Sequence, residues 1–153
     1  MVSGTGGAPA TKRPGSGARA PAKPAASRTA AASRAWVPER QDVIWIDCNP
    51  QAGGEMRDMH PMLVLSPGAF NARTGLVIGL PMTTAAYNAT NPFALAVGAA
   101  GARKTGKTSY VLCHQPKSFD WRARLAKPHP QGQLADAAFS QACAVLNQVI
   151  SIE

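Results

Sequence analysis

"DVIWIDCNPQAGGEMRDMHPMLVLS", residues 42–66, contains two strand signals separated by a loop signal. The runs "DVIWIDC" (42–48) and "MLVLS" (62–66) are rich in large apolar and β-branched residues, as buried strands are. Between them, Asn-Pro and Gly-Gly dipeptides mark a long polar loop. The stretch therefore predicts two strands joined by a long loop at the start of the folded part.

Further apolar runs continue this pattern toward the C-terminus. "GLVIGL" (75–80), "FALAV" (93–97) and "SYVLC" (109–113) each predict a strand. In "LADAAFSQACAVLNQVI" (134–150), the large apolar residues recur at helical spacing. Because short strands joined by turns are followed by one helix, the sequence predicts an α+β fold built on a compact antiparallel sheet or small barrel.

The first 35 residues differ in composition from the rest of the 153-residue chain, since they consist mostly of Ala, Pro, Gly, Ser and basic residues. Residues 1–40 hold seven Lys or Arg and one Glu, a net charge of +6 within the total of +8. Such a segment buries too little apolar surface to offset its ordering entropy. We therefore expect a disordered basic tail over 1–35 and a folded domain over 36–153. Two roles for the tail stay open, an arm for nucleic acid or an acidic partner and a dispensable extension.

Neither membrane insertion nor a disulfide framework is predicted. No apolar run approaches the roughly 18 residues that span a bilayer, so we expect a soluble, cytoplasmic protein. The three cysteines, Cys48, Cys113 and Cys143, lie far apart inside apolar stretches, which favours buried reduced thiols. We expect neither a metal ion nor another cofactor.

"GARKTGKT" (101–108) fits the pattern of a phosphate-binding loop. A working loop of this kind joins a strand to the N-terminus of a helix, whose amides hold the phosphates. The following "SYVLC" predicts a strand instead, so we interpret the motif as a hairpin loop. Its cations, Arg103, Lys104 and Lys107, either contact the phosphates of a polynucleotide or are simply solvated.

Several segments match one family in order and at similar spacing. "VPERQDVIWIDCNPQAGGEMRDMHPMLVLSP" is similar to a strand, an "NPxxGxE" loop and an "RPxxVLSP" strand. "NARTGLVIGLPMTT" is similar to a third strand with its threonine turn, and "PFALAV" and "LCHQPKSFDWRAR" to "PFEV" and "ADQVKSxxWRAR". From about Val37 to the C-terminus, the chain thus resembles the MazF/PemK family of toxin endoribonucleases.

The resemblance implies a small antiparallel SH3-like β-barrel of the MazF/CcdB type with a C-terminal helix, assembled as a homodimer. It also implies a type II toxin that cleaves single-stranded RNA at specific sequences without a metal ion, leaves a 2′,3′-cyclic phosphate and is neutralised by an acidic antitoxin. The alternative is a catalytically weakened or inactive relative that binds RNA or the antitoxin. A basic chain without cofactor motifs is compatible with either function.

Cleavage of RNA by its own 2′-hydroxyl needs a base, an acid and a donor that stabilises the charged phosphorane. The family pattern places its loop glutamate at Glu55 and its threonine at Thr83, with Thr84 as a second hydroxyl. The family arginine is replaced by His60. Three alternatives follow: His60 serves as the acid, Arg57 supplies the missing cation, or the nuclease is weakened or lost.

His114 stands where the family has an aspartate, and it is either a second imidazole close to His60 or a polar surface residue. We interpret Trp45, Phe70 and Phe93 as core residues, and Trp121 as a core residue rather than a base-stacking platform. Tyr87 is either a platform for an RNA base or an ordinary exposed loop aromatic. The resemblance implies RNA contacts from Gln115, Lys117, Ser118, Arg122 and Arg124.

Overall fold

The computed structural model describes residues 35–99 and 106–151. The predicted tail therefore lies outside the described residues except for Ala35, and so do Arg103 and Lys104.

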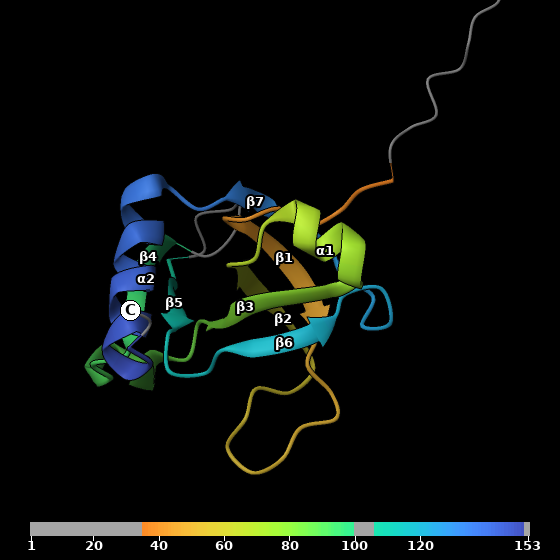
Figure 1. Cartoon of the computed structure of the whole chain (residues 1–153). Helices are drawn as coiled ribbons and strands as arrows, with labels where there is room; N and C mark the ends of the chain where they lie inside the picture. The colour runs from red at the N-terminus through yellow and green to blue at the C-terminus, as the bar shows by residue number, and fades with distance from the viewer. Residues whose placement is uncertain (1–34, 100–105, 152–153) are drawn as a thin grey trace, which may run out of the picture. The chain divides into compact units, whose positions relative to one another are not determined.

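The described residues form a curled antiparallel sheet with α2 beside β4 (Figure 1). The seven strands of this part of the chain follow the order β4-β5-β3-β2-β1-β7, and β6 pairs with β3 outside this path. The predicted α+β fold with a C-terminal helix is confirmed. The elements are β1 (Asp42–Asp47), β2 (Met59–Val64), α1 (Gly68–Thr74), β3 (Leu76–Thr83), the 3-10 helix η1 (Ala86–Thr90), β4 (Ala94–Ala99), β5 (Thr108–Leu112), β6 (Lys117–Asp120), β7 (Lys127–Gln133) and α2 (Asp136–Val149).

All of the predicted strands and the predicted helix are present, but α1, η1, β6 and β7 were not predicted. The sequence of β7, "KPHPQGQ", contains two prolines and a glycine, which are unfavourable in central strands. Because β7 pairs only with β1, it is an edge strand, where a proline that cannot donate a hydrogen bond is tolerated. The short β6, "KSFD", likewise lacks an apolar run.

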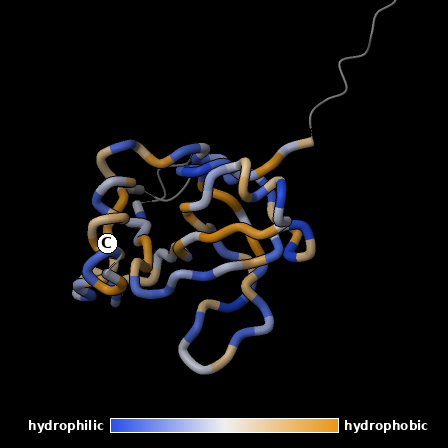
Figure 2. Tube along the Cα trace, in the orientation of Figure 1, coloured by the Kyte–Doolittle hydropathy of each residue, from blue (hydrophilic) through white to orange (hydrophobic). Residues whose placement is uncertain are grey.

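The strands carry buried apolar side chains on both faces of the sheet. Hydrophobic residues concentrate along the strands (Figure 2). On β1, Val43 belongs to a hydrophobic cluster that includes Phe139 and Leu146 of α2, whereas Ile44 and Ile46 belong to a second cluster with Phe119 and Trp121. This alternation follows from the period of two in a strand. Each strand residue therefore faces the same cluster as the residues two positions before and after it.

Asn71 links α1 to the start of the domain and to the turn after β6. Its side chain is fully buried, and its Nδ2 donates a hydrogen bond to the Pro38 carbonyl at 2.8 Å. The indole Nε1 of Trp121 donates to the Asn71 carbonyl at 3.0 Å. Trp121 is itself 7% exposed, so the interpretation of this residue as part of the core is confirmed.

The segment that resembles a phosphate-binding loop lies between two antiparallel strands. Ala99 at the end of β4 pairs with Thr108 at the start of β5. Because Thr108 begins a strand, the helix N-terminus that a nucleotide loop requires is missing here, as the sequence predicts. Lys107 is exposed.

Cys48 and Cys113 are buried and Cys143 is half-buried, and all three thiols are free. Burial raises the pKa of Cys113 to about 11, which keeps this thiol protonated at neutral pH. The prediction of buried thiols therefore holds for Cys48 and Cys113, whereas Cys143 is only half-buried.

Within the ranges 35–99 and 106–151, the helices are too short or too polar to cross a membrane.

Candidate active site

His60 and Thr83 are brought to the same face of the sheet by the pairing of β2 with β3. Met62 pairs with Pro81, and His60 lies two residues before Met62 while Thr83 lies two residues after Pro81. Because side chains alternate along a strand, residues two apart share a face. His60 and Thr83 also border one cavity at this end of the two strands. The structure therefore brings together the two predicted site residues of β2 and β3.

Lys117 lies further along the same face. It pairs with Gly79, which precedes Thr83 by four residues and so shares its face. A side chain at Gly79 would collide with the Leu63 carbonyl, so only glycine fits beside the neighbouring strand. Four residues span about 13 Å along a strand, so Lys117 and Thr83 lie about 13 Å apart along the strand direction on this face.

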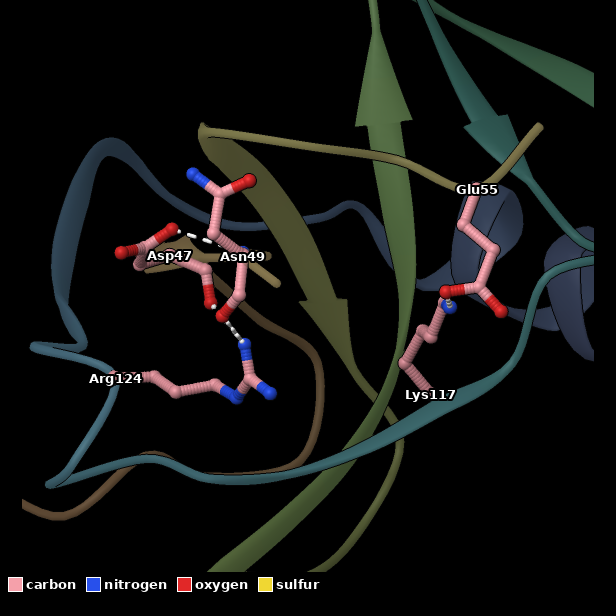
Figure 3. Close-up of polar contacts among 5 residues, drawn as sticks. All are labelled: Asp47, Asn49, Glu55, Lys117 and Arg124. Carbon is pink, nitrogen blue, oxygen red and sulfur yellow. Dashed lines mark hydrogen bonds and ion pairs between the residues drawn. The ribbon is translucent and has the colours of Figure 1, made fainter. Parts of the chain in front are cut away.

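Glu55 is held at this face by an ion pair with Lys117 (Figure 3). Its Oε2 lies 2.6 Å from the Lys117 Nζ, and the lysine side chain is 17% exposed against 49% for the glutamate. The hydrogen bond and charge of Lys117 keep the pKa of Glu55 below its ordinary value. We call the set Glu55, His60, Thr83 and Lys117 the polar face.

The Thr83 hydroxyl keeps its proton available. Its Oγ1 accepts a hydrogen bond from the Ala85 backbone N–H at 3.2 Å, which uses a lone pair and leaves the O–H free to donate. His60 is half-buried. The two side chains thus offer a hydroxyl donor and an imidazole at the border of one cavity, a combination suited to binding phosphate and moving a proton.

Arg124 holds the base of the loop between β1 and β2. Its Nη1 donates to the Asp47 carbonyl at 3.0 Å and also to the Asn49 carbonyl, and its guanidinium lies 4.2 Å from the centroid of the Phe119 ring (Figure 3). Arg122, by contrast, lies over the Trp121 ring at 4.3 Å. The structure therefore gives Arg124 an anchoring role in addition to the RNA contact that the resemblance implies.

The remaining predicted residues of this region do not all lie on the polar face. Ser118 is exposed on β6 next to Lys117, so alternation turns it to the opposite face. Arg57 is exposed in the loop between β1 and β2. Tyr87 in η1 is 77% exposed. Phe93 is 41% exposed, so the interpretation of Phe93 as a core residue was wrong.

His114 and Gln115 lie beside the ion pair rather than beside His60. Together with Glu55 and Lys117 they line a cavity of about 350 Å³. The His114 Nδ1 and the Gln115 Oε1 are buried without a hydrogen-bond partner among the described residues. His60 borders a different cavity, so the structure does not pair the two imidazoles.

The cavity that His60 and Thr83 border contains a second histidine that sequence reasoning missed. His129 of β7 lies with its ring centroid 4.7 Å from that of Trp45. The interpretation of Trp45 as a core residue was wrong, because it is half-buried and lines this cavity of about 540 Å³. We call it the Trp45–His129 cavity; its other lining residues are Met59, Pro61, Met82, Thr84, Lys107, Ser109 and Gln131.

Across residues 35–99 and 106–151, no three His, Cys, Asp or Glu side chains are grouped closely enough to hold a metal ion.

Comparison with known proteins identifies the family. Residues 39–150 match the family described as PemK-like, MazF-like toxin of type II toxin-antitoxin system. The chain is 36% identical over 91 residues to the endoribonuclease toxin MazF of Escherichia coli strain K12, an alignment that covers 60% of this chain and 76% of the relative. The crystal structure of MazF from Deinococcus radiodurans matches with a TM-score of 0.67 and 29% identity, over 76% of this chain and 99% of the other. A MazE-MazF structure from the same organism matches with a TM-score of 0.63 and 29% identity, over 77% and 99%. The chain therefore belongs to the family of PemK-like, MazF-like toxins of type II toxin-antitoxin systems.

Proposed function

We propose that this chain is an endoribonuclease toxin that cleaves single-stranded RNA on the polar face. The observation that carries the proposal is that β2, β3 and β6 present His60, Thr83 and Lys117 on one face, with Glu55 held there by Lys117. A relative 36% identical to the chain is named an endoribonuclease. The family model also matches the strands that carry these residues.

The reaction that suits these groups is attack of the RNA on itself. The 2′-oxygen forms a bond to the adjacent phosphorus as the bond from phosphorus to the 5′-oxygen breaks, leaving a 2′,3′-cyclic phosphate and a 5′-hydroxyl. Glu55 takes the proton of the 2′-hydroxyl, and protonated His60 gives a proton to the leaving 5′-oxygen. The Thr83 hydroxyl donates to a non-bridging oxygen, where negative charge develops. None of these steps needs a metal ion.

Glu55 serves as the base only after it leaves Lys117. The carboxylate and a phosphate compete for the same ammonium, since both are anions that pair with lysine. RNA binding at Lys117 therefore releases the carboxylate, and the loop that carries Glu55 then moves toward His60. Because Lys117 lies about 13 Å along the strand from the level of Thr83, it holds a phosphate other than the one being cleaved.

His60, rather than Arg57, takes the place of the family arginine in this proposal. Arg57 is exposed in the loop, whereas His60 is half-buried and borders one cavity with Thr83. Arginine is always charged, but histidine exchanges a proton near neutral pH. The replacement therefore keeps a proton donor at this position.

The proposal extends to partners. Solved structures similar to this chain include MazE-MazF complexes, so we propose that an acidic antitoxin segment covers the polar face and excludes RNA. We also propose a homodimer, acting in the cytoplasm, whose expression without the antitoxin arrests growth. Cleavage is assigned to residues 36–153, and the tail 1–35 is proposed to be dispensable for it. Light scattering of the purified chain, alone and with a partner, tests the assembly.

The nuclease proposal is tested with purified protein, a long mixed single-stranded RNA and EDTA. Cleavage is expected from the wild type, and strongly reduced cleavage from Thr83→Val, which keeps the side-chain shape but removes the hydroxyl. Ser140→Ala, an exposed change in α2, is the matched control and should cleave at the wild-type rate. RNA that stays intact with the wild type at several pH values would reject the proposal.

A further inference from the structure

The Trp45–His129 cavity contains polar groups that the cleavage chemistry does not use. Ser109 is 4% exposed and His129 is 8% exposed, yet both line the cavity. Each of these two side chains brings a polar group to the cavity, a hydroxyl from Ser109 and an imidazole from His129. A few polar groups in a mostly apolar cavity are the usual means by which a binding site fixes the orientation of a small ligand.

A hydrogen bond at one ring nitrogen fixes the proton of His129. The Gln131 backbone N–H, which can only donate, lies 3.1 Å from the His129 Nδ1. Nδ1 must therefore be unprotonated, and the neutral ring carries its proton on Nε2. His129 thus presents a fixed, uncharged N–H donor.

Protonation of His129 is opposed by its surroundings. Burial lowers the pKa of His129 below its ordinary value. A second proton on Nδ1 would also break the hydrogen bond with Gln131. The donor on Nε2 therefore persists unchanged through neutral pH.

The other lining residues suit a flat, acceptor-rich ligand. Trp45 supplies an aromatic surface, which is how proteins hold unpaired bases. Lys107 adds a cationic donor, and no lining residue is a carboxylate. About 540 Å³ lies within the usual range of small-ligand cavities and exceeds what a single base needs.

We propose that the Trp45–His129 cavity binds one unpaired nucleobase of the RNA, and that His129 and Ser109 select guanine or uracil over adenine or cytosine. Guanine presents the neighbouring acceptors O6 and N7, and uracil presents carbonyl acceptors, whereas adenine and cytosine present an amino donor at the matching position. The assignment rests on the proposed function for its substrate. Since His60 and Thr83 border the cavity, the base belongs to a nucleotide next to the cleaved phosphate.

The test uses 2′-O-methylated RNA trimers with a central G, U, A or C, which cannot be cleaved because they have no free 2′-hydroxyl. Binding is followed by tryptophan fluorescence. The wild type is expected to bind the G or U trimer about tenfold more tightly than the A and C trimers, the effect of one or two hydrogen bonds. Equal affinity for all four trimers overturns the proposal.

The variants separate recognition from folding. His129→Phe keeps a ring against Trp45 but removes the donor, and Ser109→Ala removes the hydroxyl; each should reduce the preference to about twofold while affinity for A and C trimers stays. His129→Gln, which returns an amide donor, should restore part of the preference, and Ser140→Ala should keep all of it. A full preference in folded His129→Phe, checked by thermal unfolding, overturns the proposal.

Cleavage of unmodified RNA is measured on the same protein samples. Base-selective trimer binding without cleavage would reject the nuclease function and leave the base cavity standing. Cleavage whose base preference is unaffected by His129→Phe and Ser109→Ala would reject the base cavity and leave the nuclease function standing.

Discussion

The ammonium of Lys117 and the carboxylate of Glu55 lie 2.6 Å apart, and this ion pair ties the loop between β1 and β2 to β6 (Figure 3). Both residues belong to the polar face. In the free protein, the carboxylate of Glu55, the proposed base, therefore pairs with the Lys117 ammonium that an RNA phosphate would bind. Lys117 is mostly buried, which limits screening of the pair by solvent. Binding and chemistry are thereby linked through one contact.

Glu55→Gln is expected to tighten RNA binding and slow cleavage. The amide releases the Lys117 ammonium for a phosphate, so the slope of log affinity against log salt should steepen by about 0.7, as for one added contact with a single strand. Turnover at saturating RNA should fall because the base is lost. Filter binding over a salt series and single-turnover cleavage separate the two effects. Unchanged affinity and salt slope would show that the pair does not compete with RNA.

The pH dependence of cleavage is expected to come from His60. Lys117 keeps the pKa of Glu55 below 4.5, so the ion pair is formed above that value and is lost only as pH falls through the lowered pKa. A general acid acts only while it carries its proton, so a histidine in this role predicts cleavage that slows toward alkaline pH. His60→Arg should flatten this decline, since arginine stays charged. A pH–rate profile of the two proteins checks it, and identical profiles would contradict the role of His60.

Substitution should distinguish His60 from Arg57. His60→Ala removes the proposed acid and is expected to lower the cleavage rate about 100-fold or more. Arg57→Ala alters only an exposed loop cation, so its effect should be confined to a small loss of RNA affinity. If Arg57→Ala is the inactive variant and His60→Ala is active, the arginine has replaced the family cation and the assignment fails.

Arg124→Ala is expected to lower the free energy of unfolding by about 1.5–3 kcal/mol, because charge-assisted hydrogen bonds to two backbone carbonyls are lost. Arg122→Ala, which removes a guanidinium stacked on Trp121, should cost only about 0.5–1 kcal/mol. Urea unfolding of both variants makes the comparison. Equal small losses, with RNA affinity reduced in both, would make Arg124 a surface RNA contact rather than an anchor.

His129 should make folding stability depend on pH. Burial lowers the pKa of His129 in the folded chain. At a pH between this lowered pKa and the ordinary histidine value, the unfolded chain therefore binds a proton at His129 and the folded chain does not. Stability should therefore decline as pH falls from the ordinary histidine value of 6.5 through the lowered pKa. Thermal unfolding across this range should show a smaller decline for His129→Phe than for the wild type. An equal decline in both proteins would show that a group other than His129 causes the pH dependence of stability.

The sequence predicted the parts of the fold that rest on local signals. The strands around Ile44 and Leu63 are apolar runs bounded by turn residues, and α2 shows helical spacing, so both could be recognised without long-range information. β7 could not, because an edge strand tolerates the prolines around His129 only through its pairing with β1.

The functional site likewise contains residues that a sequence pattern identifies and contacts that only the fold creates. Glu55, His60 and Thr83 were identified by a sequence pattern, and in the folded chain His60 and Thr83 border one cavity. The Trp45–His129 cavity brings together strands distant in sequence, and no local signal marks Trp45 as other than a core residue. The ion pair between Glu55 and Lys117 also depends on how a long loop folds back, which spacing alone does not specify.

The most direct test of the central claim is to map the ends of RNA fragments produced in EDTA by the wild type and by His60→Ala. The wild type is expected to yield fragments that end in a 2′,3′-cyclic phosphate and begin with a 5′-hydroxyl, and the variant is expected to yield little product. Intact RNA, fragments with 3′-hydroxyl ends, or equal cleavage by His60→Ala would contradict this claim.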